Sequence, residues 1–210
     1  IGINLKSPRG QEIFQKLAKN ADVIVETFRP GVMKRLHCDY DTISKENPRV
    51  IYLSLSGYGQ SGPYADLPGH DVNYISIGGV LDLIGDSEHP PTVPWNFIAD
   101  LASGVMHGII GVLLGLIARE KTGKGQHVDV SYLDGVVSLL GSLPIIPEYL
   151  LKGVIPKRGE TSLSGAYPYY GIYQTKDSGF ISLGCMEPHY WRNLCHALGR
   201  EDLDEYYSRP

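Results

Sequence analysis

Apolar positions in the first third of the chain change between helical and strand-like spacing. Ser7 and Pro8 are typical of a helix start, and the apolar residues that follow, up to Ala18, recur at helical intervals. Short apolar runs at 22–26 and 50–55 predict buried strands, with a short helix before the second run. Because alternation of helices and strands builds parallel sheets, we expect an α/β fold.

The longest apolar stretch, Leu101–Ala118, is long enough to be considered as a membrane span. It is interrupted by Ser103, His107 and several glycines, and it runs directly into charged residues. We therefore expect a buried core helix with closely packed small residues, and no membrane span. The opening residues, Ile1–Leu5, are too short for the apolar region of a signal peptide.

The pattern changes after a tight turn at 122–126. A strand is predicted over 127–131, because apolar and polar residues alternate there. A helix is predicted over 133–150, interrupted at Pro144 and Pro147. Apolar periodicity then stops.

A polar segment, 152–166, separates this helix from the rest of the chain. Beyond it, two apolar runs on either side of 176–179 predict a hairpin, and a helix follows from about 188 to 198. We expect 1–152 to be part of a large domain with linker helices, and 153–210 to be the start of a small α+β domain.

Composition limits the classes of partner. The chain of 210 residues is 42% apolar and has a net charge of −4, so it offers no basic stripe to a nucleic acid. Its three cysteines are odd in number and lack Cys-x-x-Cys spacing, which favours a reducing, cytoplasmic compartment. His189, Cys195 and His196 fall on one predicted helix without a partner motif, so no metal site is expected.

His70 and Asp100 are the strongest candidates for chemistry. Each lies where a loop rich in glycine or proline gives way to a predicted helix. A histidine and a carboxylate presented in this way can act as two acid/base groups at one reaction centre, and a structural hydrogen bond is the alternative. The loop 57–69 follows a predicted strand, where α/β proteins bind ligands. Arg29 and Arg35 flank a predicted helix start and suit an anionic ligand, with surface salt bridges as the alternative.

Five motifs follow one another along the chain. They are Phe28-Arg-Pro-Gly-Val-Met-Lys-Arg-Leu36, Ser54-Leu-Ser-Gly-Tyr-Gly-Gln-Ser-Gly-Pro63, Gly69-His-Asp-Val-Asn-Tyr74, Lys121-Thr-Gly-Lys-Gly-Gln126 and Val128-Asp-Val-Ser-Tyr-Leu-Asp-Gly135. Together they strongly resemble the family III CoA-transferase superfamily, which also contains the α-methylacyl-CoA racemases. The resemblance spans residues 1 to about 200. It implies the middle portion of a full-length member, with an incomplete Rossmann-like sheet and long helices in its large domain.

The resemblance also implies partners. These are an acyl-CoA thioester, with no separate cofactor, and a second copy of the chain in an interlocked homodimer whose active site lies between the large and small domains of different subunits. Arg29 and Arg35 match arginines that contact the CoA phosphates, and Tyr74 belongs to the same substrate-binding set. The resemblance places such an enzyme in lipid metabolism.

Within the superfamily we expect the racemase reaction. His70 and Asp100 match the racemase acid/base pair, and Glu187 matches a glutamate that hydrogen-bonds the histidine. One base would remove the α-proton of a 2-methylacyl-CoA, and the acid opposite would protonate the other face of the enolate. The backbone N–H of Asp71 is the candidate donor to the enolate oxygen. Burial in an apolar site would let Asp100 hold the proton that it donates.

Two alternatives stay open. A CoA-transferase would use Asp134, which matches the transferase nucleophile, to form a mixed anhydride and then an enzyme–CoA thioester. The glycine run that transferases usually carry is absent from 158–166. The other alternative is a non-catalytic CoA-binding fragment. Trp95 replaces an aliphatic residue that is typical of the family, which would reshape the acyl pocket.

Overall fold

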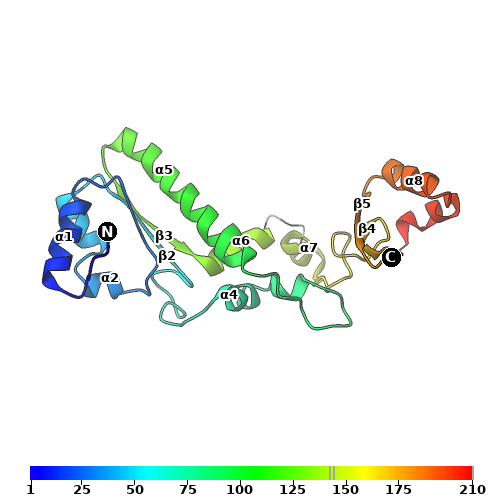
Figure 1. Ribbon diagram of the computed structural model, residues 1–210, viewed down its shortest axis with the longest axis horizontal. Coiled ribbons are helices and arrows are strands. Elements are labelled where there is room, and N and C mark those ends of the chain that lie inside the picture. The colour runs from blue at the N-terminus through cyan, green and yellow to red at the C-terminus, as the bar shows by residue number, and fades with distance from the viewer. Residues whose placement is uncertain (142, 144, 210) are drawn as a thin grey trace. The chain divides into compact units, whose positions relative to one another are not determined.

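The computed structural model describes residues 1–141, 143 and 145–209, so the helix interruption predicted at Pro144 lies outside the described residues. The chain divides into two compact units (Figure 1). The first comprises Ile1–Gly78 and Trp95–Ser142, and the second comprises Gly79–Pro94 and Leu143–Pro210. The domain boundary expected between residues 152 and 153 stays a prediction.

The first unit is built on a three-stranded parallel sheet. Its strands are β1 (Val23–Glu26), β2 (Ile51–Ser56) and β3 (Gln126–Ser131), in the order β1-β2-β3. All six residues of the central strand β2 are buried, as expected for a strand that is covered on both faces. The sheet confirms the α/β prediction, and each strand lies within one residue of its predicted position.

Helices connect and cover these strands. They are α1 (Pro8–Ala18), α2 (Val32–Arg35), α3 (Tyr40–Glu46), α4 (Asp71–Ile77), η2 (Phe97–Val105), α5 (Met106–Thr122) and α6 (Tyr132–Gly141). α1 begins as predicted, since Ser7 Oγ accepts a hydrogen bond from the Gly10 N–H at 3.0 Å. A cluster of buried side chains fills the space between α1, α2, α3 and the sheet: Ala18, Ile24, Met33, Cys38, Ile43, Val50 and Tyr52.

The long helix formed by η2 and α5 packs on one side only. Its glycines face β2 and β3, where a Cβ at Gly111 would lie 2.6 Å from Val128 Cγ1. On the other side Leu113 and Leu114 are more than half exposed, so the expectation of a buried core helix is wrong for this face. Among the described residues, Phe97–Thr122 is long and apolar enough to cross a membrane, with mean hydropathy 2.1, a test that core helices of water-soluble proteins also pass.

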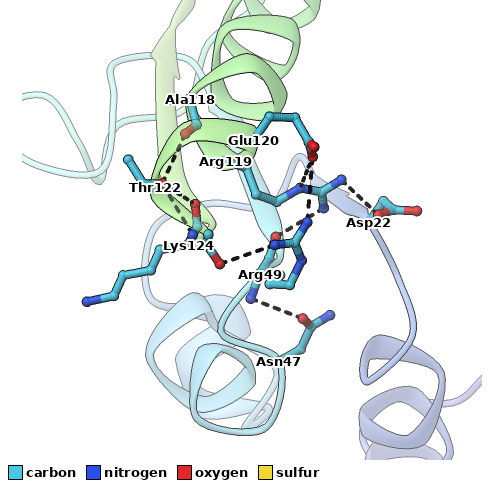
Figure 2. Close-up of polar contacts among 9 residues, drawn as sticks. Asp22, Asn47, Arg49, Ala118, Arg119, Glu120, Thr122 and Lys124 are labelled. Atoms are coloured by element: carbon cyan, nitrogen blue, oxygen red, sulfur yellow. Dashed lines mark hydrogen bonds and ion pairs between the residues drawn. The ribbon is translucent and has the colours of Figure 1, made fainter.

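A nearly buried guanidinium fixes the end of α5 to the sheet (Figure 2). Arg119 Nη2 lies 2.9 Å from Asp22 Oδ1, just before β1, and Nη1 donates to the Arg49 carbonyl at 3.2 Å, just before β2. Gly123 then ends the helix with a φ of 71°, and Thr122 Oγ1 donates to a carbonyl one turn earlier. These contacts gather at the amino ends of the strands, which leaves the carboxyl ends to the loops that form a cleft.

The second unit contains an antiparallel hairpin and further helices. β4 (Tyr170–Gln174) pairs with β5 (Phe180–Gly184), which confirms the predicted hairpin. The helices are η1 (Leu81–Leu83), α7 (Ile145–Lys152), α8 (Pro188–Ala197) and η3 (Glu201–Ser208). Tyr169, Trp191 and Cys195 form the buried core of this unit, between the hairpin and α8.

Candidate active site

A cleft of about 610 Å³ opens at the carboxyl ends of β1 and β2. Its walls come from the loops that follow these strands and from α4, η2 and α6. The lining side chains with the most useful chemistry are Arg29, His70, Tyr74, Asp100 and Tyr132. Part of the loop 57–69 also lines the cleft, at the end of the sheet where α/β proteins bind ligands.

His70 lies immediately before α4. Its backbone N–H donates to Asn73 Oδ1 at 3.0 Å, which fixes the first turn of the helix. The imidazole is exposed to solvent at the cleft wall, so a substrate in the cleft can reach it.

Asp100 lines the same cleft from η2. It is half-buried, and its Oδ2 accepts a long hydrogen bond of 3.4 Å from Asn96 Nδ2. Asp100 is the fourth residue of this helix, which begins at Phe97, rather than lying at its start as predicted. η2 is a π-helix, a wider turn that occurs frequently at functional sites.

Asp71 connects the elements that carry these two residues. The residue is only 4% exposed. Oδ2 accepts hydrogen bonds from the Ala99 N–H at 2.8 Å and the Asp100 N–H at 2.9 Å. The first residue of α4 is therefore bonded directly to the first turn of η2.

Two tyrosine rings form one wall of the cleft. Tyr74 and Tyr132 stack with ring centroids 5.3 Å apart. Burial raises the pKa of Tyr74 to about 12, and burial together with the Asp100 charge raises the pKa of Tyr132. Both hydroxyls therefore stay protonated near neutral pH. Gly57 and Gly69 make room for the Tyr74 ring, since a Cβ at either position would lie within 2.7 Å of it.

The two arginines that were predicted to contact the CoA phosphates differ in their position relative to the cleft. Arg29 lines the cleft and also a smaller pocket of about 150 Å³ next to it. Arg35 is exposed on α2, and it lines neither cavity. A ligand in the cleft can thus contact Arg29, whereas Arg35 is available to a group outside the cleft.

The other predicted acids do not line the cleft. Asp134 is exposed on α6, where its backbone N–H donates to Ser131 Oγ at 3.1 Å. Glu187 is exposed directly before α8 in the second unit, so its hydrogen bond to His70 stays a prediction. The described residues include no group of three or more His, Cys, Asp or Glu side chains placed to hold a metal ion.

Two features of the cleft were not predicted from the sequence. The first is Tyr132, which follows β3 directly. Because ligands usually bind at the carboxyl ends of parallel strands, the predicted strand could have identified this residue. The second is the pair of hydrogen bonds that the Asp71 carboxylate accepts. No local pattern predicts them, because their donors lie 28 and 29 residues away in the sequence.

Comparison with known proteins identifies one family, and the similar proteins include both a racemase and a CoA-transferase. The family described as CoA-transferase family III matches residues 1–209. Alpha-methylacyl-CoA racemase of Homo sapiens is 40% identical over 197 residues, which cover 94% of this chain and 51% of the racemase. The succinyl-CoA–L-malate CoA-transferase beta subunit of Chloroflexus aurantiacus is 36% identical over 205 residues, covering 97% of this chain and 50% of the transferase.

A solved structure is also similar. The CAIB/BAIF family protein from Brucella suis superposes with a TM-score of 0.82 at 30% identity, over 98% of this chain and 53% of that protein. The chain spans about half the length of the curated relatives that it matches.

Proposed function

We propose that this chain, which belongs to CoA-transferase family III, is part of an enzyme that interconverts (R)- and (S)-2-methylacyl-CoA thioesters. One observation carries the proposal: a single cleft is lined by an imidazole and a carboxylate, His70 and Asp100. A racemase needs such a pair, because the α-proton leaves one face of the carbon and returns to the other. The 40% identity to a human alpha-methylacyl-CoA racemase supports this choice.

The reaction needs two proton carriers and a place for negative charge. An imidazole accepts and releases protons near neutral pH, so His70 can act as either base or acid. Asp100 acts from the other side of the α-carbon. The enolate oxygen is stabilised by the backbone N–H of Asp71, which as the first helical residue has no partner within its helix. The neutral Tyr74 hydroxyl adds a second hydrogen-bond donor on the same wall.

Substrate binding follows from charge. Arg29 makes charge-assisted hydrogen bonds to a CoA phosphate at the cleft, and Arg35 contacts a phosphate outside it. Glu187 fixes the tautomer of His70 when the large and small domains of a homodimer come together. Such an enzyme would act in lipid metabolism in the cytoplasm.

A CoA-transferase is the second candidate, favoured by the 36% identity to a Chloroflexus transferase subunit. Its nucleophile must reach the thioester carbonyl and form an anhydride. Asp134 was predicted for that role, yet it is exposed outside the cleft lining, whereas Asp100 lines the cleft. A carboxylate nucleophile is therefore better supplied by Asp100. A non-catalytic CoA-binding protein is the third candidate.

One experiment separates the three candidates. The protein is incubated in deuterium oxide with a 2-methylacyl-CoA and no acceptor acid, and α-deuteration is followed by NMR or mass spectrometry. A racemase exchanges the α-proton under these conditions. Exchange that is absent, together with CoA transfer once an acceptor acid is added, would replace the racemase with the transferase. Binding of CoA without either activity would leave the non-catalytic candidate.

A further inference from the structure

We propose that the Asp71 side chain is a positioning residue that holds Asp100 in place relative to His70. This inference rests on the proposed function and adds to it, since the oxyanion role belongs to the Asp71 backbone. Asp71 follows His70 directly in the chain, and its Oδ2 accepts the N–H groups of Ala99 and Asp100. One carboxylate oxygen thus joins the backbone segments of both acid/base residues.

The backbone that connects His70 to Asp100 leaves their own unit. Between α4 and η2 the chain passes through 79–94, which belongs to the second unit. There Arg158 holds it, with guanidinium donors to the carbonyls of Asp82, Asp86 and His89. The relative position of His70 and Asp100 therefore depends on contacts across the cleft wall, and the Asp71 hydrogen bonds are direct ones.

The hydrogen bonds also replace an ordinary helix cap. The first N–H groups of a helix have no partner within the helix, and a side chain just before it usually accepts from them. Asn96, at that position of η2, makes no capping hydrogen bond and donates to Asp100 instead. The cap comes from the Asp71 carboxylate, whose Oδ2 accepts both the Ala99 and the Asp100 N–H groups.

The geometry suggests a conservative variant. Asp71 Oδ2 carries both hydrogen bonds, while Oδ1 is buried without a partner among the described residues. In Asp71→Asn the amide oxygen can take the place of Oδ2, so both bonds can form. Asp71→Ala removes both bonds while keeping the backbone N–H.

Asn47 offers a matched control in the same unit. It is buried like Asp71, and its Nδ2 donates to the carbonyls of Ala18 and Ala21, both at 2.9 Å. Its Oδ1 also accepts from the Arg49 N–H at 3.2 Å, so Asn47→Ala removes three side chain–backbone hydrogen bonds, one more than Asp71→Ala, and all of them away from the cleft lining. Any loss that comes only from a weakened fold appears in both alanine variants.

The test compares kcat and KM for α-proton exchange in Asp71→Ala, Asp71→Asn and Asn47→Ala, with thermal unfolding of each. We expect Asp71→Ala to lower kcat by about tenfold or more with little change in KM, because small misplacements of reacting groups are costly. Asp71→Asn recovers most of that loss, and Asn47→Ala keeps the wild-type kcat at temperatures where it is folded.

Equal kcat values in Asp71→Ala and Asn47→Ala would overturn the inference, as would an Asp71→Asn variant as slow as Asp71→Ala. The wild-type enzyme tests the proposed function separately. If it transfers CoA and does not exchange the α-proton, the racemase proposal fails, and the same kcat comparison is made on transfer, for which Asp100 is the nucleophile proposed above. If it does neither, both proposals fail.

Discussion

The two units each contain a cavity of almost the same size, with very different chemistry. The cleft of the first unit measures about 610 Å³ and the pocket of the second unit about 620 Å³. The first is lined by His70, Asp100 and Arg29. The second is lined mainly by apolar side chains such as Ile181 and Trp191. Volume alone therefore does not identify a reaction site, whereas convergent polar groups do.

The difference follows from how each cavity is built. Loops at the carboxyl ends of parallel strands present polar side chains that need not pack, so the first cavity can hold titratable groups. The second cavity lies against the hairpin and α8, whose side chains form a core. Two of its polar groups are already satisfied, since Trp191 Nε1 donates to the Leu203 carbonyl at 3.2 Å and the Tyr173 hydroxyl donates to the Pro168 carbonyl at 2.7 Å. The first cavity is suited to chemistry and the second to packing.

The largest effect should come from removing either acid/base group of the first cavity. We expect His70→Ala and Asp100→Ala each to lower α-proton exchange by about 10²–10⁴-fold, the usual cost of a lost general acid or base. CoA affinity, measured by calorimetry, should change little, because neither residue is assigned to the CoA phosphates. Ile181→Ala in the second cavity is the matched control, with a rate close to wild type. Near-normal exchange in either cleft variant would remove that residue from the mechanism.

The second cavity should respond in stability instead. Trp191 is 5% exposed in the core of its unit. Trp191→Ala should lower the free energy of unfolding by about 3–5 kcal/mol, through lost contacts and the cavity left behind. Urea unfolding followed by circular dichroism measures this loss. An unchanged midpoint would mean that the second cavity is not part of a packed core.

Substitution of the two arginines should raise KM to different extents, because Arg29 lines the cleft and Arg35 does not. Hydrogen bonds to charged groups contribute about 1.5–3 kcal/mol, so Arg29→Ala should raise KM for the acyl-CoA by roughly 10–100-fold. Arg35→Ala should have a smaller effect that disappears at high salt, because Arg35 is exposed and its charge is screened. Steady-state kinetics at two ionic strengths measure both. A larger loss for Arg35 than for Arg29 would place the CoA phosphates outside the cleft.

Local patterns predicted the scaffold well. The three parallel strands were predicted within one residue, because short apolar runs identify β1 and β2, and alternation of apolar and polar residues identifies β3. Ser7 and Pro8 correctly predicted the start of α1. The predicted helix from 133 to 150 corresponds to two helices, α6 and α7, on either side of the two undescribed positions. The interruption predicted at Pro147 is wrong, because this proline lies in the first turn of α7, where its missing N–H would have no partner within the helix.

Properties that depend on distant parts of the chain could not be predicted. The apolar residues of α5 indicated burial, but periodicity does not say which surface covers them, and Leu114 is more than half exposed. The spacing of apolar residues over the nine positions of η2 does not distinguish a π-helix from an α-helix, so the position of Asp100 within η2 was missed. The side-chain role of Asp71 depends on hydrogen bonds across 28 and 29 residues. Asp134 was predicted from the resemblance to a family, and its role as a nucleophile stays a prediction; its side chain is exposed and is not part of the cleft lining.

The smallest effect is expected at Asp134. Its side chain is exposed in the first turn of α6, where an acidic residue stabilises the helix by about 0.3–1 kcal/mol. Asp134→Asn should therefore lower stability slightly and leave α-proton exchange within about twofold of wild type, since exposed substitutions of this kind change free energies by roughly 0.5 kcal/mol. The same variant is assayed for CoA transfer with an acceptor acid, beside Asp100→Asn. An amide cannot form the anhydride, so the variant that abolishes transfer identifies the nucleophile. Loss of transfer in Asp134→Asn with retention in Asp100→Asn would return that role to Asp134, and it would show that the reacting carboxylate lies outside the cleft.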